Sequence, residues 1–354
     1  MKILILALSG IGDALMFTPA ASLIKKHFQG CELDALVMFK GVRDIYERLP
    51  YIDNVYHFDF LSRGSQASLK FLLKLRYNYD ATINVYPSNR REYNLINFLI
   101  GAKKRAAVEY LRKDKQNLGW LSNVRVTEDD NKHNVITNIK LCEKLLGKEF
   151  NEEPDLDFFL NSDDHKAARE FEAANNIQMS DFIVGIHPGC ATLKNHIQRR
   201  WEPEKFAELS RRLIKENNAK VLIFGGPEEE ELKKNVHKKI HSNDAIIVHT
   251  KNLAESAAIM QRCNLFVTND SSLMHVASAM KVKTAAIIGP TNPEYIHPWK
   301  TKHIIISLNL ECAPCFIYSP RPLICFREDV KFKCVKELTV DFAYNKILHF
   351  MNED

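Results

Sequence analysis

An aspartate stands directly behind a pair of glycines near the start of the chain. Ser9-Gly10-Ile11-Gly12-Asp13 follows a short apolar run and opens an amphipathic stretch, which predicts a tight turn between a strand and a helix. In the first turn of a helix, the dipole and the unpaired N–H groups would keep the carboxylate of Asp13 ionised. Such a carboxylate, facing a ligand, can accept a proton as a general base. The alternative is that Asp13 only caps its helix.

A second candidate site is a loop rich in hydroxyl and cationic side chains, which follows the predicted strand ending at His187. Its candidate residues are Thr192, Lys194, Arg199 and Arg200. Cations beside a hydroxyl suit a diphosphate, although a basic loop is equally compatible with plain solvated surface. The next strand-to-helix turn holds Glu229, which would either cap the helix or bind ribose hydroxyls.

A third turn leads from a predicted strand into a helix and carries several small polar residues. The unpaired N–H groups at the start of a helix form an anion site, and here they belong to Ser271, Ser272 and Leu273. Asp270 would cap that helix or bind sugar hydroxyls. His275, one turn into the helix, is either a ligand-binding residue or a packed bystander.

All three segments lie where a short apolar run gives way to an amphipathic stretch. This pattern repeats along the chain and indicates βαβ units with parallel sheets. The predicted strands are Lys2–Leu8, Leu33–Phe39, Asn54–Phe58, Ala81–Tyr86, Phe182–His187, Lys220–Phe224, Ala245–Val248, Leu265–Thr268 and Thr284–Ile288. The predicted helices are Asp13–Phe28, Ser65–Arg76, Pro203–Glu216, Glu228–Ile240, Leu253–Arg262, Ser271–Met280 and Val340–Phe350.

Two separate runs of alternation predict two Rossmann-like α/β domains rather than one barrel. The polar stretch Asn151–His165 marks the join, so we expect an N-terminal domain at 1–160 and a C-terminal domain at 161–337. The last helix, about 338–354, is expected to pack back on the first domain. A small ligand would bind between the domains, beyond the carboxyl ends of the strands.

The composition is that of an ordinary globular protein. The 354 residues include 49 Lys and Arg against 44 Asp and Glu, a net charge of +5, with 45% hydrophobic and 26% charged residues. These values exclude a disordered, collagenous or membrane-spanning chain. The apolar run Ile3–Leu8 is shorter than the roughly 7–15 residues at the centre of a signal peptide. Eight cysteines are too few for a disulfide scaffold, so we expect a reducing cytoplasm.

A dinucleotide site is disfavoured at the first turn. Leu15 stands where the pattern G-x-G-x-x-G needs its third glycine, and no acidic residue marks the end of the second predicted strand. An NAD-dependent oxidoreductase is therefore a weaker hypothesis.

Together these segments resemble the heptosyltransferase family, glycosyltransferase family 9. The matching motifs are Gly10–Leu15 through Thr18-Pro19-Ala20, His187-Pro188-Gly189 through Arg200-Trp201, Thr268–His275, and Ile288–Pro293. They occur in order along nearly the whole chain. The resemblance implies a GT-B fold, in which two Rossmann-like domains with parallel sheets face an interdomain cleft. It also implies transfer of heptose from ADP-heptose to the inner core of lipopolysaccharide.

The resemblance further implies roles for individual residues. We expect an inverting reaction that needs neither a metal nor another cofactor. Asp13 falls on the catalytic base. The donor-binding positions fall on Thr192, Arg199, Glu229, Asp270, Ser271, Ser272, Leu273 and His275. From the basic loop itself, we also expect Lys194 and Arg200 to bind the donor. Ser272 replaces a usual glycine, and Arg199 stands where most relatives have lysine; these two departures bear on the donor sugar and not on the reaction class. The alternatives are a transferase for another nucleotide sugar and a non-catalytic nucleotide-sugar-binding protein.

Cations outnumber acids in one stretch of the first domain. The cations are Arg90, Arg91, Lys103, Lys104, Arg105, Arg112, Lys113 and Lys115, against Glu92, Glu109 and Asp114. A basic face would hold an acidic glycolipid or glycan acceptor and attract an anionic leaflet, so we expect Arg90 and Arg91, with Gly12, on the acceptor side. The alternative is solvated surface. No nucleic-acid-binding module accompanies the stretch, so we expect no nucleic-acid partner. The expected location is the cytoplasm, with transient contact to the inner membrane.

Half of the cysteines gather near the C-terminus. They are Cys312, Cys315, Cys325 and Cys334. A Cys-x-x-Cys pair with two further thiols is compatible with a tetrahedral zinc site, but the second Cys-x-x-Cys of a typical site is missing. We favour free thiols and no metal, with zinc and a disulfide as the alternatives.

Overall fold

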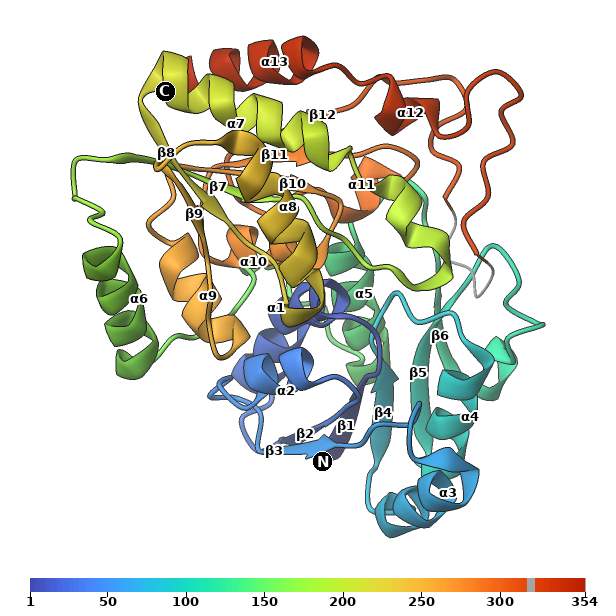
Figure 1. Ribbon diagram of the computed structural model, residues 1–354. Coiled ribbons are helices and arrows are strands. Elements are labelled where there is room, and N and C mark those ends of the chain that lie inside the picture. The colour runs from blue at the N-terminus through green and yellow to red at the C-terminus, as the bar shows by residue number, and fades with distance from the viewer. Residues whose placement is uncertain (317–321, 354) are drawn as a thin grey trace. The chain divides into compact units, whose positions relative to one another are not determined.

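The computed structural model describes residues 1–316 and 322–353. The described residues divide into two compact units (Figure 1). Unit 1 comprises residues 1–159 and 294–296, and unit 2 comprises residues 160–293, 297–316 and 322–353. None of the helices in these residues is both long and apolar enough to cross a bilayer.

Unit 1 is built on a parallel sheet of six strands, as far as the described residues show, in the order β3-β2-β1-β4-β5-β6. Its strands are β1 (Lys2–Ala7), β2 (Glu32–Val37), β3 (Asn54–His57), β4 (Ala81–Asn84), β5 (Lys104–Glu109) and β6 (Val124–Thr127). Its helices are α1 (Ile11–His27), α2 (Lys40–Tyr46), α3 (Gly64–Leu75), α4 (Arg91–Ile100), α5 (Asn134–Leu146) and the 3₁₀ turn η1 (Gly119–Leu121). The central strand β1 is a nearly continuous apolar run because both faces of a parallel sheet are covered.

One face of this sheet packs against α3 and α4. Leu72 and Leu75 of α3 meet Ile96 and Ile100 of α4 in a hydrophobic cluster that includes residues of β1 and β2. Helices α1 and α5 pack against each other, and α5 also packs on β5 and β6. The turns at the carboxyl ends of the strands remain outside these layers and carry the polar residues of interest.

Unit 2 repeats the plan with a second parallel sheet, which has six strands among the residues described, in the order β12-β11-β10-β7-β8-β9. Its strands are β7 (Phe182–His187), β8 (Ala219–Ile223), β9 (Ala245–Ile247), β10 (Leu265–Asn269), β11 (Thr284–Ile287) and β12 (His303–Ile306). Its helices are α6 (Ser162–Ala174), α7 (Pro203–Asn217), α8 (Glu230–Ile240), α9 (Leu253–Met260), α10 (Ser272–Ala279), α12 (Lys333–Lys336) and α13 (Val340–Asn352), with the 3₁₀ segments η2 (Leu193–Arg199) and η3 (Pro227–Glu229). Helix α11 (Pro293–Ile296) contributes its last three residues to unit 1.

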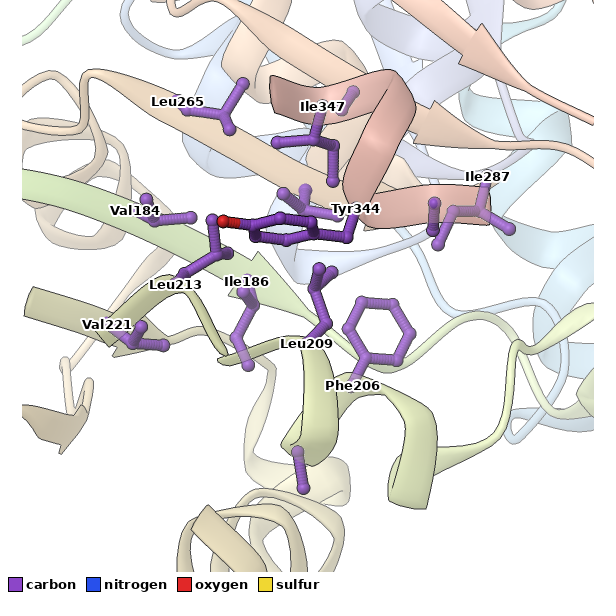
Figure 2. Close-up of a cluster of buried hydrophobic side chains, with 14 of the residues drawn as sticks. Val184, Ile186, Phe206, Leu209, Leu213, Val221, Leu265, Ile287, Tyr344 and Ile347 are labelled. Carbon is purple, nitrogen blue, oxygen red and sulfur yellow. The ribbon is translucent and has the colours of Figure 1, made fainter. Parts of the chain in front are cut away.

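The C-terminal helix α13 belongs to unit 2, so the expectation that the segment 338–354 packs on the first domain is wrong; residue 354 itself lies outside the described residues. Figure 2 shows Tyr344 and Ile347 of α13 among Leu209 and Leu213 of α7 and Ile186 of β7. The Tyr344 hydroxyl donates to Asn217 Oδ1 at 2.9 Å, and the Arg212 guanidinium lies 3.8 Å from the Tyr344 ring centre. The helix packs here because each buried apolar side chain contributes about 1.5–3 kcal/mol.

Candidate functional site

Each sheet contains one point where the winding direction of the chain reverses. In unit 1 it lies between β1 and β4, and in unit 2 between β7 and β10, because these neighbours are not consecutive in sequence. In open α/β sheets, ligands bind at such points, beyond the carboxyl ends of the strands. The turn after β1 carries Asp13, and the turns after β7 and β10 carry the basic loop and the residues from Asp270 onward.

Asp13 is the third residue of α1, and Gly12 is buried one position before it. The Gly10 N–H donates to Asp13 Oδ2 at 3.3 Å, so the carboxylate does act as a cap for the helix start. Burial raises the pKa of Tyr93 and of Tyr110, and the negative charge of Asp13 adds to both shifts. The half-buried carboxylate therefore lies close to two neutral phenols at the carboxyl edge of the sheet.

Arg90 precedes α4 at the same edge. Its guanidinium lies 5.5 Å from the ring centre of Tyr93, the phenol that also feels the charge of Asp13. Arg91 is exposed in the first turn of α4. Both residues expected on the acceptor side thus follow β4, the strand beside β1.

The basic stretch from Arg90 to Lys115 does not form the single face expected from sequence. Lys104 and Arg105 begin β5, and Arg105 donates to the carbonyl oxygens of Leu121 and Ala102. Arg112 follows the other end of β5 and forms an ion pair with Asp130. A six-residue strand spans roughly 20 Å, so the cations are divided between opposite edges of the sheet.

In unit 2, the imidazole of His187 connects the turns on either side of β7. Its Nδ1 lies 2.9 Å from Ser271 Oγ, in the turn after β10, and its Nε2 lies 2.9 Å from Glu229 Oε2, in the turn after β8. The side chains of all three residues are buried. Because an ionised carboxylate only accepts hydrogen bonds, Nε2 carries a proton toward Glu229.

Glu229 is held from several sides. The Gly226 N–H donates to Oε2 at 3.1 Å, and Arg200 donates to Oε1 at 3.3 Å. Burial by itself raises the pKa of Glu229, but the hydrogen bond and charge of His187, the Gly226 N–H and the charge of Arg200 outweigh it and lower the pKa. A Cβ atom on Gly189 would lie 1.8 Å from Glu229 Oε1, so only glycine allows this close approach.

Arg199 and Asp270, both expected to bind a ligand, form a buried ion pair with each other. Thr291 donates to the same carboxylate oxygen at 2.6 Å, and the Arg199 guanidinium lies 5.1 Å from the ring centre of Phe316. These contacts fix one side of the Arg199 guanidinium and one side of the Asp270 carboxylate. Nevertheless, the Nε atoms of Arg199 and Arg200 are buried without a hydrogen-bond partner among the described residues.

The start of α10 has the features of an anion site. Ser271 precedes the helix in an extended conformation, Ser272 is half-buried, and Leu273 is buried. His275, one turn further, is buried, and its Nδ1 has no hydrogen-bond partner in the part of the chain that the structure describes. Burial lowers the pKa of His275 to about 4, although the charge of Asp270 opposes this shift. His275 is therefore neutral at pH 7.

Thr192 and Lys194 are less buried than the residues described above. Thr192 is exposed, and Lys194 and Asn195 adopt left-handed backbone angles, with φ of 55° and 63°. The Leu323 N–H donates to the Lys194 carbonyl oxygen at 2.9 Å, and Asn195 Nδ2 donates to the Leu323 carbonyl oxygen at 2.8 Å. A segment more than a hundred residues away in sequence thus holds the conformation of this loop.

His187 and Asn269 organise the site, but the sequence did not identify either as a site residue. Asn269 accepts from the Trp201 N–H at 2.9 Å and donates to the Pro188 carbonyl oxygen at 2.9 Å. Both are polar residues at the last position of a buried strand. A polar residue at the end of an apolar strand could have identified both from the sequence, because a buried polar side chain requires hydrogen-bond partners.

The four C-terminal cysteines come close together in space. Burial, helped by the other three thiols, raises the pKa of Cys334 to about 11. Within residues 1–316 and 322–353, no group of three or more acidic, histidine or cysteine side chains has an arrangement that could hold a metal. The zinc alternative stays a hypothesis, which metal analysis of protein purified without a histidine tag would test.

Comparisons with known proteins bear on the family of the chain and on its fold. The sequence profile of glycosyltransferase family 9 (heptosyltransferase) matches residues 69–321. The chain is similar to lipooligosaccharide heptosyltransferase 2 of Campylobacter jejuni, with 26% identity over 98% of each chain. It is also similar to lipooligosaccharide heptosyltransferase 2 of Haemophilus influenzae, with 25% identity over 87% of this chain and 89% of that protein.

The fold also matches a solved structure. The structure of E. coli ADP-heptose lps heptosyltransferase II covers 99% of this chain and 98% of its own, with a TM-score of 0.73 and 18% identity. The expected fold class, α/β with two Rossmann-like parallel sheets as in GT-B enzymes, is therefore confirmed.

Proposed function

Because this chain belongs to glycosyltransferase family 9 (heptosyltransferase), we propose that it transfers heptose from ADP-heptose to a sugar of the lipopolysaccharide or lipooligosaccharide core. The names of its relatives support this donor and acceptor. A transferase for a different nucleotide sugar is the alternative within the same reaction class.

The observation that carries the proposal is the set of buried polar atoms that lack partners at the β7/β10 reversal point. They are Arg199 Nε, Arg200 Nε and His275 Nδ1, stated for the described residues. Buried polar atoms are normally hydrogen-bonded, so such a group requires an explanation. A diphosphate bound at the start of α10 would accept from the arginines and from the free N–H groups of the helix.

In the proposed mechanism, Asp13 removes the proton of an acceptor hydroxyl while that oxygen attacks the anomeric carbon of heptose. The bond between this carbon and the phosphate oxygen breaks, and ADP leaves from the opposite face, so the configuration inverts. Negative charge develops on the diphosphate, and Arg199, Arg200 and the start of α10 stabilise it. Arg90 and Arg91 would bind acidic groups of the acceptor.

The test of the base is Asp13→Asn, which keeps the size of the side chain but removes its ability to take a proton. A general base contributes about 10²–10⁴-fold to a rate, so we expect kcat to fall by at least a hundredfold with little change in ADP affinity. Asp44→Asn, on α2, is the matched control. Measured ADP release near the wild-type rate in Asp13→Asn would exclude Asp13 as the base.

Two further measurements separate the alternatives. Product analysis by NMR should show inversion at the anomeric carbon, and activity should persist in EDTA because the positive charge comes from the protein. A different result would be a wild type that binds ADP-heptose without transferring heptose to any lipopolysaccharide core that lacks one or more heptoses. That result would indicate a non-catalytic nucleotide-sugar-binding protein.

A further inference from the structure

Helix α3 has one apolar face in the core and a second, partly apolar face in solvent. Leu72 and Leu75 pack into unit 1, whereas Leu69 and Leu73 are 47% and 52% exposed on the outer side. Leu69 and Leu73 are four residues apart and therefore stand one above the other on the helix. Lys70 and Lys74 follow them directly and are also exposed, so the outer face alternates leucine and lysine.

The segment between Asp59 and Asp80, which contains this helix, carries only positive charge. Residues 60–79 contain Arg63, Lys70, Lys74 and Arg76 and no aspartate or glutamate, a net charge of +4. Such a local concentration differs from the chain as a whole, where cations and acids are nearly balanced, at 49 against 44. The outer side of α3 is therefore both basic and apolar.

The surface continues onto the end of α4 through Tyr77. This tyrosine is 71% exposed, its N–H donates to the Ile100 carbonyl oxygen at 2.9 Å, and its ring occupies the space beside Gly101, 2.7 Å from where a Cβ would be. Phe98, three residues before Gly101, is 47% exposed, and the Arg105 guanidinium lies 5.6 Å from its ring centre. We call Leu69, Lys70, Leu73, Lys74, Tyr77 and Phe98 the α3 face.

We propose that the α3 face docks the protein on the surface of an anionic lipid bilayer. Leucine and aromatic side chains enter the boundary between headgroups and acyl chains, while lysines contact acidic headgroups and extend their apolar stems along the surface. Tyrosine favours the same interfacial depth. The proposal rests on the proposed function in one respect: a lipid-anchored core acceptor has to be met at a bilayer.

Charge complementarity favours this occupant over a second copy of the chain. Two α3 faces brought together would place four lysines near one another, Lys70 and Lys74 of each copy, and neither face contains an acid. An anionic bilayer instead attracts every one of these cations. The lysines are thus the discriminating residues.

Co-sedimentation of the full-length protein with vesicles tests the proposal. The vesicles contain phosphatidylcholine alone or phosphatidylcholine with phosphatidylglycerol, at low salt. The variants are K70Q/K74Q and L69S/L73S, with K234Q/K238Q as control, because Lys234 and Lys238 are also exposed, four residues apart on one helix, and their replacement removes the same charge. All replaced side chains are exposed, so thermal unfolding should be unchanged.

We expect the wild type and K234Q/K238Q to bind only the anionic vesicles, and K70Q/K74Q to bind them about 30-fold more weakly. L69S/L73S should also bind more weakly. Equal binding of K70Q/K74Q and K234Q/K238Q, or no binding of the wild type, would overturn the proposal. A concentration-dependent dimer that L69S/L73S abolishes, without vesicle binding, would assign the face to a second copy and overturn it as well.

Failure of the docking proposal can be distinguished from failure of the proposed function. Heptose transfer to a delipidated, water-soluble core acceptor should be the same in K70Q/K74Q and the wild type. A wild type that binds anionic vesicles but transfers no heptose would contradict the proposed function and leave the docking surface supported.

Discussion

The contacts of His187 with two different turns can be separated by two substitutions. The amide nitrogen of glutamine reaches the position of Nε2, and that of asparagine reaches the position of Nδ1. His187→Gln therefore keeps a donor for Glu229 and loses the contact with Ser271, while His187→Asn does the reverse. If His187 positions the carboxylate of Glu229 for the nucleoside, the two variants should differ in ADP affinity.

The structure sets the size of this difference. A hydrogen bond to a charged group contributes about 1.5–3 kcal/mol, and a bond between neutral groups about 0.5–1.5 kcal/mol. Glu229 is buried, and after the loss of its 2.9 Å bond to His187 its remaining hydrogen-bond partners among the described residues are Gly226 and Arg200. If that loss is felt in nucleoside binding, the Kd of ADP should rise roughly 10- to 150-fold in His187→Asn. His187→Gln should show a rise of only about 2- to 10-fold.

Isothermal titration calorimetry with ADP measures both values, and thermal unfolding without ligand shows whether each variant is folded. His237→Gln is the control. His237 lies on α8, away from these turns, and its Nε2 contacts the Ala245 carbonyl oxygen at 3.0 Å. Equal ADP affinity of His187→Asn and His187→Gln would refute a positioning role. A wild type that does not bind ADP would refute the proposed donor instead.

Three other perturbations test the structure of unit 2. His275 has its ordinary pKa of 6.5 in the unfolded chain and a pKa of about 4 in the folded protein. Because only the unfolded chain takes up this proton between these two values, the free energy of unfolding is highest above pH 6.5 and falls as the pH falls toward 4. Urea unfolding of the wild type should show a decrease of about 3 kcal/mol in the free energy of unfolding over this pH range. His275→Gln should have a weaker pH dependence, and a pH dependence equal to that of the wild type would contradict the role of His275. Gly189→Ala should lower the unfolding free energy by about 1–3 kcal/mol, because its Cβ displaces Glu229; wild-type stability in chemical denaturation would show that the carboxylate moves freely. Tyr344→Ala should cost about 3–5 kcal/mol, with Phe342→Ala, on the exposed side of α13, as a nearly neutral comparison in the same assay.

Local sequence pattern predicted the elements that carry the turns, since burial on both faces gives central parallel strands continuous apolar runs. Phe182–His187 has the same bounds in the sequence prediction and in the structure. The strands β5, β6 and β12 were missed. β5 begins with Lys104 and Arg105 inside a basic stretch, and β6 and β12 are edge strands whose residues are mostly half-exposed. Val124–Thr127 alternates apolar and polar residues, and His303–Ile306 holds only three apolar residues, so neither gives an apolar run as long as that of a central strand.

Residue type and position after a strand are local properties, so the sequence was enough to identify the turns that carry chemically capable residues. Which of those residues contact one another depends on the three-dimensional arrangement of the strands. Arg199 pairs with Asp270, 71 residues away, and His187 joins Ser271 to Glu229. Both contacts form because β7 lies between β8 and the later strand β10 in the sheet. In unit 1, the length of β5 divided the basic stretch between two edges of the sheet. Strand order depends on long-range packing, which local sequence patterns do not encode.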